Sequence, residues 1–167
     1  MPEISQKIDQ LTNSIVNRIS GDSFTTDVIE LKIEELKQLK KGWQFDWSKE
    51  FMGIAKVYKL VIRHYPEVIQ GLVSLIDKGD HIYMNLLESA PHNFGENKIY
   101  EGAAGNLVAF ACKVSLEKGY SGIVAFEAKT KLIEHYKLIL KAQLFAGNRL
   151  FIDERAALFL IGKYFNQ

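Results

Sequence analysis

The segment from Gly102 to Asn106, with the sequence GAAGN, has the composition of an anion-binding turn at the start of a helix. The first backbone N–H groups of a helix have no intrahelical partner and carry the positive end of the helix dipole. Small residues allow a phosphate to approach those groups closely. The segment has neither the Gly-Lys-Ser/Thr ending of a Walker loop nor the three-glycine dinucleotide fingerprint. It predicts either a phosphate cradle of another kind or the close packing of a helix on a sheet.

An acidic residue, Glu88, ends a predicted strand over residues 81–88 and is a candidate general base. Strict alternation along this strand would place Glu88 on one face with three apolar residues, Ile82, Met84 and Leu86. A carboxylate at the edge of an apolar stripe is partly desolvated, which strengthens it as a proton acceptor. A solvated carboxylate at a strand end fits the same pattern equally well. His92 is the second candidate, because an ordinary imidazole titrates near neutral pH.

Metal and thiol chemistry are not indicated. The four histidines stand at positions 64, 81, 92 and 135 without the HExxH or clustered spacing of a metal site, so no metal is expected. The single cysteine, Cys112, cannot form an intramolecular disulfide. Its place in a predicted helix favours a buried and unreactive thiol.

The composition is that of one soluble domain. The chain has 167 residues and a net charge of +1, which gives no general attraction to nucleic acid or to anionic membranes. No apolar run approaches the roughly 20 residues of a membrane-spanning helix, and residues 1–10 do not resemble a secretory signal. A single cytoplasmic domain over residues 1–167 is therefore expected.

Hydrophobic periodicity predicts the elements that must position these residues. Residues 8–30 fit either a strand pair or a short helix followed by a strand, and an amphipathic helix is predicted from Ile33 to a stop near Gly42. An antiparallel meander follows, with Gly71 marking a bulge; its three strands are predicted over 57–64, 68–76 and 81–88.

The second half of the chain alternates helices and strands. The predicted order is a helix after residue 105, a short buried strand over 122–128, a helix over 131–141, two strands over 143–145 and 150–152, and an apolar helix over 156–165. Strand, helix and strand in the middle imply a parallel pair joined by a right-handed crossover. The fold class is therefore mixed α/β, with a mostly antiparallel twisted sheet flanked by helices.

This order of elements, together with one motif, resembles the GNAT superfamily of N-acetyltransferases. Residues 99–104, Ile-Tyr-Glu-Gly-Ala-Ala, align with the family signature Gln/Arg-x-x-Gly-x-Gly/Ala, whose backbone amides bind the pyrophosphate of coenzyme A. The glycine and alanine positions match, but the leading residue is Ile99. Lys98 lies beside it and is expected to supply a phosphate contact instead. The resemblance covers residues 68–152.

The resemblance implies an acetyltransferase that moves an acetyl group from acetyl-CoA directly to a primary amine. Backbone N–H groups of the Leu87–Ser89 stretch would polarise the thioester carbonyl, and Tyr136 would protonate the departing thiolate. The family usually has an asparagine near the end of the buried strand, where this chain has Lys129 or Thr130. The implied cofactor-binding residues are Leu87, Ser89, Gly102, Ala103, Ala104, Gly105, Asn106 and Lys129, and the implied catalytic residues are Glu88 and Tyr136.

Two other functions stay open. The missing Gln/Arg fits a GNAT-like module that binds acyl-CoA or another partner without turnover. A GNAT toxin that acetylates aminoacyl-tRNA keeps the same chemistry, although the near-neutral charge argues against a large tRNA surface. The acceptor, a small-molecule or protein amine, is not identified. The apolar helix over 156–165 is expected to pack either on its own sheet or on a second copy of the chain.

Overall fold

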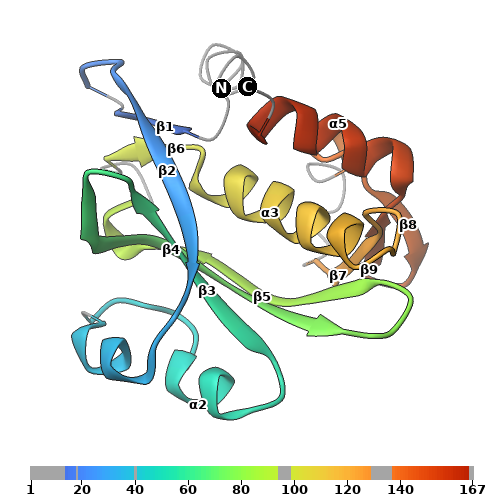
Figure 1. Ribbon diagram of the computed structural model, residues 1–167, viewed down its shortest axis with the longest axis horizontal. Coiled ribbons are helices and arrows are strands. Elements are labelled where there is room, and N and C mark those ends of the chain that lie inside the picture. Colours follow the sequence, from blue (N-terminus) through green and yellow to red (C-terminus); the bar gives the residue numbers. More distant parts are fainter. Residues whose placement is uncertain (1–13, 18, 40, 94–98, 129–136, 166–167) are drawn as a thin grey trace.

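The computed structural model describes residues 14–17, 19–39, 41–93, 99–128 and 137–165. In these residues nine strands form one sheet with the order β6-β1-β2-β3-β4-β5-β7-β9-β8 (Figure 1). The strands are β1 (Ser14–Asn17), β2 (Ser23–Glu30), β3 (Lys56–Ile62), β4 (Tyr65–Asp77), β5 (Ile82–Ser89), β6 (Tyr100–Glu101), β7 (Val124–Glu127), β8 (Gln143–Ala146) and β9 (Arg149–Ile152). All neighbours run antiparallel except β5 and β7, which are parallel.

The predicted mixed and mostly antiparallel sheet is confirmed, and so are the meander and the parallel pair. Of the two alternatives for residues 8–30, the structure has the strand pair, because β1 and β2 are antiparallel neighbours. Most of the predicted helix over 131–141 lies outside the described residues. Residues 137–139 are helical.

Helices cover both faces of the sheet (Figure 1). On one face lie α3 (Ala103–Glu117) and α5 (Glu154–Phe165), side by side. On the other lie the 3-10 helix η1 (Ile33–Gln38), predicted as an α-helix, and α2 (Trp47–Met52), which the sequence did not predict. The Asp46 side chain caps α2 by accepting from the Lys49 N–H at 3.0 Å. A further 3-10 turn, η2, spans Pro91–Asn93.

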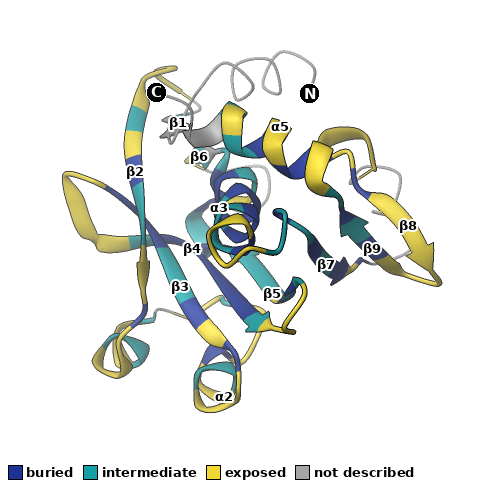
Figure 2. Cartoon of the chain, turned by 45° about the vertical axis from the view of Figure 1, so that its right-hand side comes forward, coloured by how far each residue is buried: buried dark blue, intermediate teal, exposed yellow. Residues whose placement is uncertain are grey.

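Two hydrophobic cores result. The main core lies between the sheet and α3 with α5, and Leu107, Leu150 and Leu160 are fully buried in it. A smaller core under η1 and α2 is centred on Trp47 and Leu72. Figure 2 shows the buried residues gathered in the middle strands and in α3. None of the described helices has the length and apolar character needed to cross a membrane.

Helix α3 approaches the sheet closely over Gly71. A Cβ atom at this glycine would lie 3.0 Å from Leu107 Cδ1 and 3.2 Å from the Glu88 carbonyl oxygen. The pairing also shifts here, from Leu60 opposite Gly71 to Val61 opposite Ile69, so the predicted bulge is confirmed. Glycine therefore allows both the bulge and the seating of the helix.

A second bulge lies in β5 and changes which face Glu88 occupies. Ser74 pairs with Leu86 and Leu75 with Met84, which leaves Asn85 as the extra residue. Ile82 and Met84, before the bulge, lie in the main core. Beyond it, Leu86 packs in the smaller core and Glu88 bonds to Trp47. The expectation that Glu88 shares a face with Ile82 and Met84 is wrong, because one extra residue reverses the alternation.

The last helix packs on its own sheet, which was one of the two expectations. Ala156, Ala157 and Leu160 of α5 are buried in the main core. Leu158 and Phe159, on the opposite side of α5, are 50% and 44% exposed.

Candidate functional site

Strands β5 and β7 part soon after they meet. They pair only at Ile82 with Val124 and at Tyr83 with Ala125, although β5 continues to Ser89. We call the residues of the two strands beyond these pairs the β5/β7 fork. Parallel α/β sheets bind ligands where the carboxyl ends of neighbouring strands separate. The fork is therefore where the cofactor of the predicted reaction would enter the sheet.

The backbone of β5 directs two amides toward the fork. The Leu86 N–H donates to Ser74 Oγ at 2.9 Å, and the Ala90 N–H donates to the Gln70 carbonyl at 3.0 Å, both toward β4. Successive N–H groups of a strand point to opposite sides. The amides of Leu87 and Ser89 therefore point away from β4, to the side where β7 has diverged. This is the orientation that their predicted role requires.

The start of α3 supplies a second group of amides. Gly102 is the N-cap with φ 100° and ψ −2°, a left-handed conformation that glycine adopts at little cost. Among the described residues no side chain caps this terminus. The first i→i−4 bond of the helix runs from the Asn106 N–H to the Gly102 carbonyl at 3.1 Å. The amides of Ala103, Ala104 and Gly105 precede that bond, and Ala104 is exposed.

Asn106, the last residue of the predicted cradle, has its polar groups directed into the protein. Its side chain is fully buried, donates to the Gly102 carbonyl at 2.7 Å and accepts from Thr26 Oγ1 at 3.4 Å. Since its backbone N–H is also bonded, Asn106 stabilises the turn around Gly102. The amides that remain for an anion are those of residues 103–105.

The Glu88 carboxylate holds the segment that leads into α2. Its oxygens accept from the Gln44 N–H at 2.6 Å, from the Phe45 N–H at 3.2 Å and from Trp47 Nε1 at 2.8 Å. Trp47 is only 2% exposed. Glu88 is therefore a half-buried acceptor of three N–H bonds, and it joins the end of β5 to residues 44–47.

The other predicted base, His92, belongs to a buried polar cluster. Its Nε2 lies 2.8 Å from Gln70 Oε1, and Asn93 Nδ2 donates to the same oxygen at 2.8 Å. The Asn93 side chain also accepts from the Tyr100 N–H at 3.0 Å. The cluster ties the loop after β5 to β4 and β6. Lys98, Lys129 and Tyr136 lie outside the described residues.

Two cavities open beside the β5 bulge, and the sequence did not predict them. Tyr83, Ala125 and Phe151 alternate along their strands with main-core residues, so they face away from α3 and α5. They line a cavity of about 560 Å³ together with Asn85. A second cavity of about 450 Å³ lies against α2 and is lined by Asp46, Lys49, Glu50, Asn85 and Leu86, among others. Asn85 and Ile76 line both.

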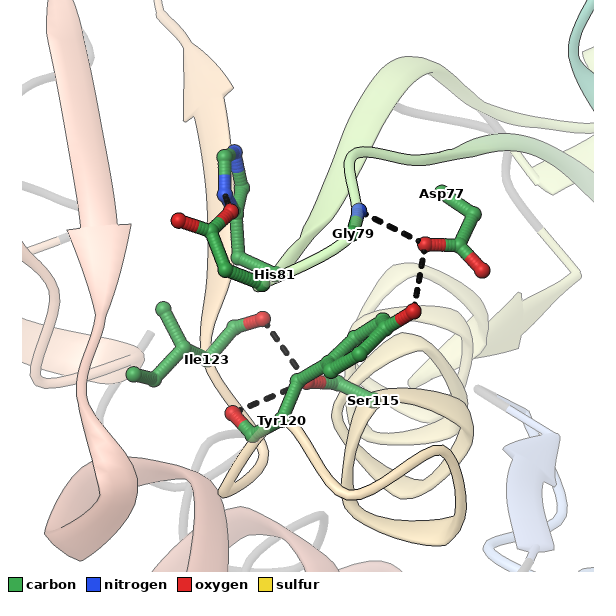
Figure 3. A network of polar contacts seen from close by, with 7 residues as sticks. Asp77, Gly79, His81, Ser115, Tyr120 and Ile123 are labelled. Carbon is green, nitrogen blue, oxygen red and sulfur yellow. Dashed lines mark hydrogen bonds and ion pairs between the residues drawn. The ribbon is translucent and has the colours of Figure 1, made fainter.

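A polar network fastens the closed end of the fork, where β5 and β7 pair (Figure 3). The Tyr120 hydroxyl donates to Asp77 at 2.8 Å, and the Gly79 N–H donates to the same oxygen at 2.9 Å. The bond from Gly79, followed by that from Tyr120, lowers the pKa of Asp77. Ser115 Oγ donates to the Ile123 carbonyl at 2.8 Å. The β4–β5 turn is thus tied to the connection between α3 and β7.

Among the described residues no group of three His, Cys, Asp or Glu side chains is placed to hold a metal ion. Cys112 is buried in α3, and burial raises the pKa of its thiol to about 12. A thiol in that state is not a nucleophile at neutral pH.

No family model and no curated protein matches the sequence. Solved structures do match. A mutant AtaT toxin bound to acetyl-CoA and the C-terminus of the antitoxin AtaR is 15% identical, with TM-score 0.57 over 81% of this chain and 97% of that chain. AtaT complexed with acetyl-methionyl-tRNA is 16% identical, with TM-score 0.56 over 81% and 98%.

A Bacillus subtilis acetyltransferase in complex with coenzyme A is 14% identical, with TM-score 0.51 over 78% of this chain and 98% of that chain. Identities this low establish the architecture and leave the activity open. The fork, the α3 turn and these likenesses agree: the chain has a GNAT-like fold.

Proposed function

We propose that this protein is an N-acetyltransferase that moves an acetyl group from acetyl-CoA directly to a primary amine. The observation that carries the proposal is the β5/β7 fork, with the Leu87 and Ser89 amides on one side and the uncapped start of α3 following in the chain. The likeness to chains solved with acetyl-CoA or coenzyme A supports it.

The α3 turn would bind the pyrophosphate. Three amides at residues 103–105 and the positive end of a 15-residue helix are suited to a diphosphate. At the leading signature position the chain has Ile99, whose side chain is 43% exposed and offers no hydrogen bond. Among the described residues, the pyrophosphate would therefore be bound by backbone amides alone. Contacts from Lys98 and Lys129 stay predictions.

The chemical step needs a polarised thioester, a free amine and a proton for the leaving sulfur. The Leu87 and Ser89 amides would bind the thioester and polarise its carbonyl. As the amine nitrogen forms its bond to the acetyl carbon, it gives up one proton, and the carbon–sulfur bond breaks. Tyr136 is proposed to return a proton to the thiolate of coenzyme A. The predicted base Glu88 would have to release at least one of its three N–H donors to take part.

Calorimetric titration with acetyl-CoA and coenzyme A tests the binding. Transfer of radioactive acetyl to spermidine, poly-L-lysine and methionyl-tRNA tests the reaction. The expected result is binding of both coenzymes and transfer to at least one amine, with Tyr136→Phe keeping the binding and losing the transfer. No binding of either coenzyme would refute the proposal. Binding without transfer would favour a non-catalytic acyl-CoA module instead.

A toxin that acetylates aminoacyl-tRNA is the second candidate, and the likeness to AtaT complexed with acetyl-methionyl-tRNA favours it. Expression in bacteria should then arrest growth, and Tyr136→Phe should relieve the arrest. Exposed Leu158 and Phe159 on α5 would suit a second copy of the chain. Light scattering of the purified protein tests whether two copies pair through α5. A mass equal to that of the monomer would contradict the pairing.

A further inference from the structure

A second carboxylate, that of Glu50, lies at the β5 bulge. Glu50 belongs to α2 and is half-buried. Its Oε2 accepts from Ser74 Oγ at 2.5 Å and from Asn85 Nδ2 at 2.6 Å. Ser74 is fully buried, and its Oγ also accepts from the Leu86 N–H at 2.9 Å. Glu50 is thus fastened to the bulge that directs the neighbouring Leu87 amide toward the fork.

The two oxygens of Glu50 differ in their surroundings. Within the described part of the chain both hydrogen bonds go to Oε2, and Oε1 accepts none. Glu50 lines the cavity of about 450 Å³ between α2 and the bulge. Glu88 does not line that cavity, and its oxygens accept hydrogen bonds from the segment 44–47. Of the two carboxylates at the bulge, Glu50 is the one that is fixed by hydrogen bonds to one oxygen and has its other oxygen available to accept a proton.

We infer that Glu50 is the general base for the acceptor amine, an assignment that rests on the acetyl transfer proposed above. The amine lone pair forms the new nitrogen–carbon bond to the acetyl carbonyl, and the nitrogen gives its proton to Glu50 Oε1. The carbon–sulfur bond then breaks, and the electron pair leaves on the sulfur of coenzyme A. The proton taken by Glu50 passes to solvent, and the thiolate is protonated in turn.

This assignment places the acceptor in the cavities on the α2 face of the sheet. The cofactor would come from the α3 side, where the turn at Gly102 lies, and the amine from the side of α2. Asn85 lines both cavities and donates to Glu50. It therefore lies beside the base, where the two cavities meet. The other charged residues that line the smaller cavity are Asp46 and Lys49, both at the start of α2.

Glu50→Gln is the direct test, because glutamine can still accept the bond from Ser74 but cannot take a proton. The control is Glu117→Gln, which makes the same change at an exposed glutamate that ends α3 and lines neither cavity. Acetyl transfer would be measured against pH with the amine of the panel that the wild type uses. Calorimetry with coenzyme A would report on the cofactor site.

Glu50→Gln should lower kcat/KM about a hundredfold or more near neutral pH, and this loss should shrink as pH rises and the amine loses its proton to solvent. Coenzyme A should bind to the Glu50→Gln variant within about twofold of the wild type, and Glu117→Gln should transfer at close to the wild-type rate. Glu50→Asp, which keeps a carboxylate, should retain partial activity near neutral pH. This rescue separates a base from a residue that only supports the fold.

The inference is overturned if Glu50→Gln keeps the wild-type rate near neutral pH, or if Glu88→Gln is the variant that loses this rate and regains it at high pH. In both cases the proposed acetyl transfer would stand. A wild type that binds acetyl-CoA but acetylates none of the panel amines would overturn the transfer and this assignment together.

Discussion

Replacing Ala104 with glutamate should raise the stability of the protein and weaken its binding of coenzyme A. Ala104 is exposed, and it occupies the second position of α3, before the first intrahelical bond at Asn106. A carboxylate in the first turn interacts favourably with the helix dipole by about 0.3–1 kcal/mol. The melting temperature should therefore rise by roughly 1–3 °C.

The same carboxylate would repel a diphosphate at those amides. Two unit charges roughly 6 Å apart, at an effective dielectric constant of about 20, interact with about 3 kcal/mol, which is about a hundredfold in affinity. Screening at physiological salt, with a Debye length of about 8 Å, roughly halves that energy. The dissociation constant for coenzyme A should therefore rise between about tenfold and a hundredfold.

Calorimetric titration at two salt concentrations, with thermal unfolding of the same samples, measures both effects. Ala104→Gln is the control, because it has the same shape without the charge. The difference between the two variants in their dissociation constants for coenzyme A should decrease as the salt concentration increases. If glutamate and glutamine at position 104 bind coenzyme A equally well, the pyrophosphate does not lie at the start of α3, and the placement of the cofactor is wrong.

Three further results follow from the described contacts. Glu88→Ala should lower the free energy of unfolding by about 2–3 kcal/mol, measured by urea unfolding, because it removes an acceptor of three N–H bonds including that of the buried Trp47 indole. Cys112 should resist iodoacetamide at pH 8 in the folded protein and react once urea unfolds it, because burial raises the pKa of its thiol to about 12. The bonds from Gly79 and Tyr120 lower the pKa of Asp77, so its contribution to stability is present above the ordinary carboxyl pKa and is lost as pH falls through the lowered value. Asp77→Asn should therefore be less stable than the wild type at pH 7, and acid unfolding curves should show this difference shrinking as pH falls below the ordinary carboxyl pKa.

Each of these results has a clear contrary outcome. An unchanged urea midpoint in the Glu88 variant would mean that water replaces the carboxylate at no cost. Alkylation of Cys112 at the same rate in folded and unfolded protein would show that the α3 core opens readily. A stability difference for Asp77→Asn that persists at low pH would mean that the asparagine disturbs the turn by its shape and that the lost charge is not the cause.

Several features were predictable because they depend on neighbours in the chain. The strands of the meander and the buried strand followed from alternation and from runs of apolar residues. The turn before α3 followed from Gly102, whose φ of 100° is costly for any residue with a side chain. The burial of Cys112 followed from its position on the apolar side of a helical repeat. In each case the feature depends on the types of a few residues that are close together in the chain.

The arrangement at the β5 bulge was decided by the tertiary structure. Strict alternation placed Glu88 with Ile82 and Met84, but a single extra residue at Asn85 reverses the faces, and no local pattern marks it. The short helix α2 was missed because six residues have little helical stability of their own and depend on packing.

The polar contacts of the candidate site span long stretches of chain. Glu50 meets Ser74 across 24 residues and Asn85 across 35, and Glu88 meets Gln44 across 44. The sequence by itself predicted most of the strands, helix α3 and the turn at its start, for which it proposed an anion-binding role. Only the tertiary structure decided which carboxylate faces a cavity. Hydrogen bonds between groups far apart in the chain depend on position in space, and they produce no periodic pattern in the sequence.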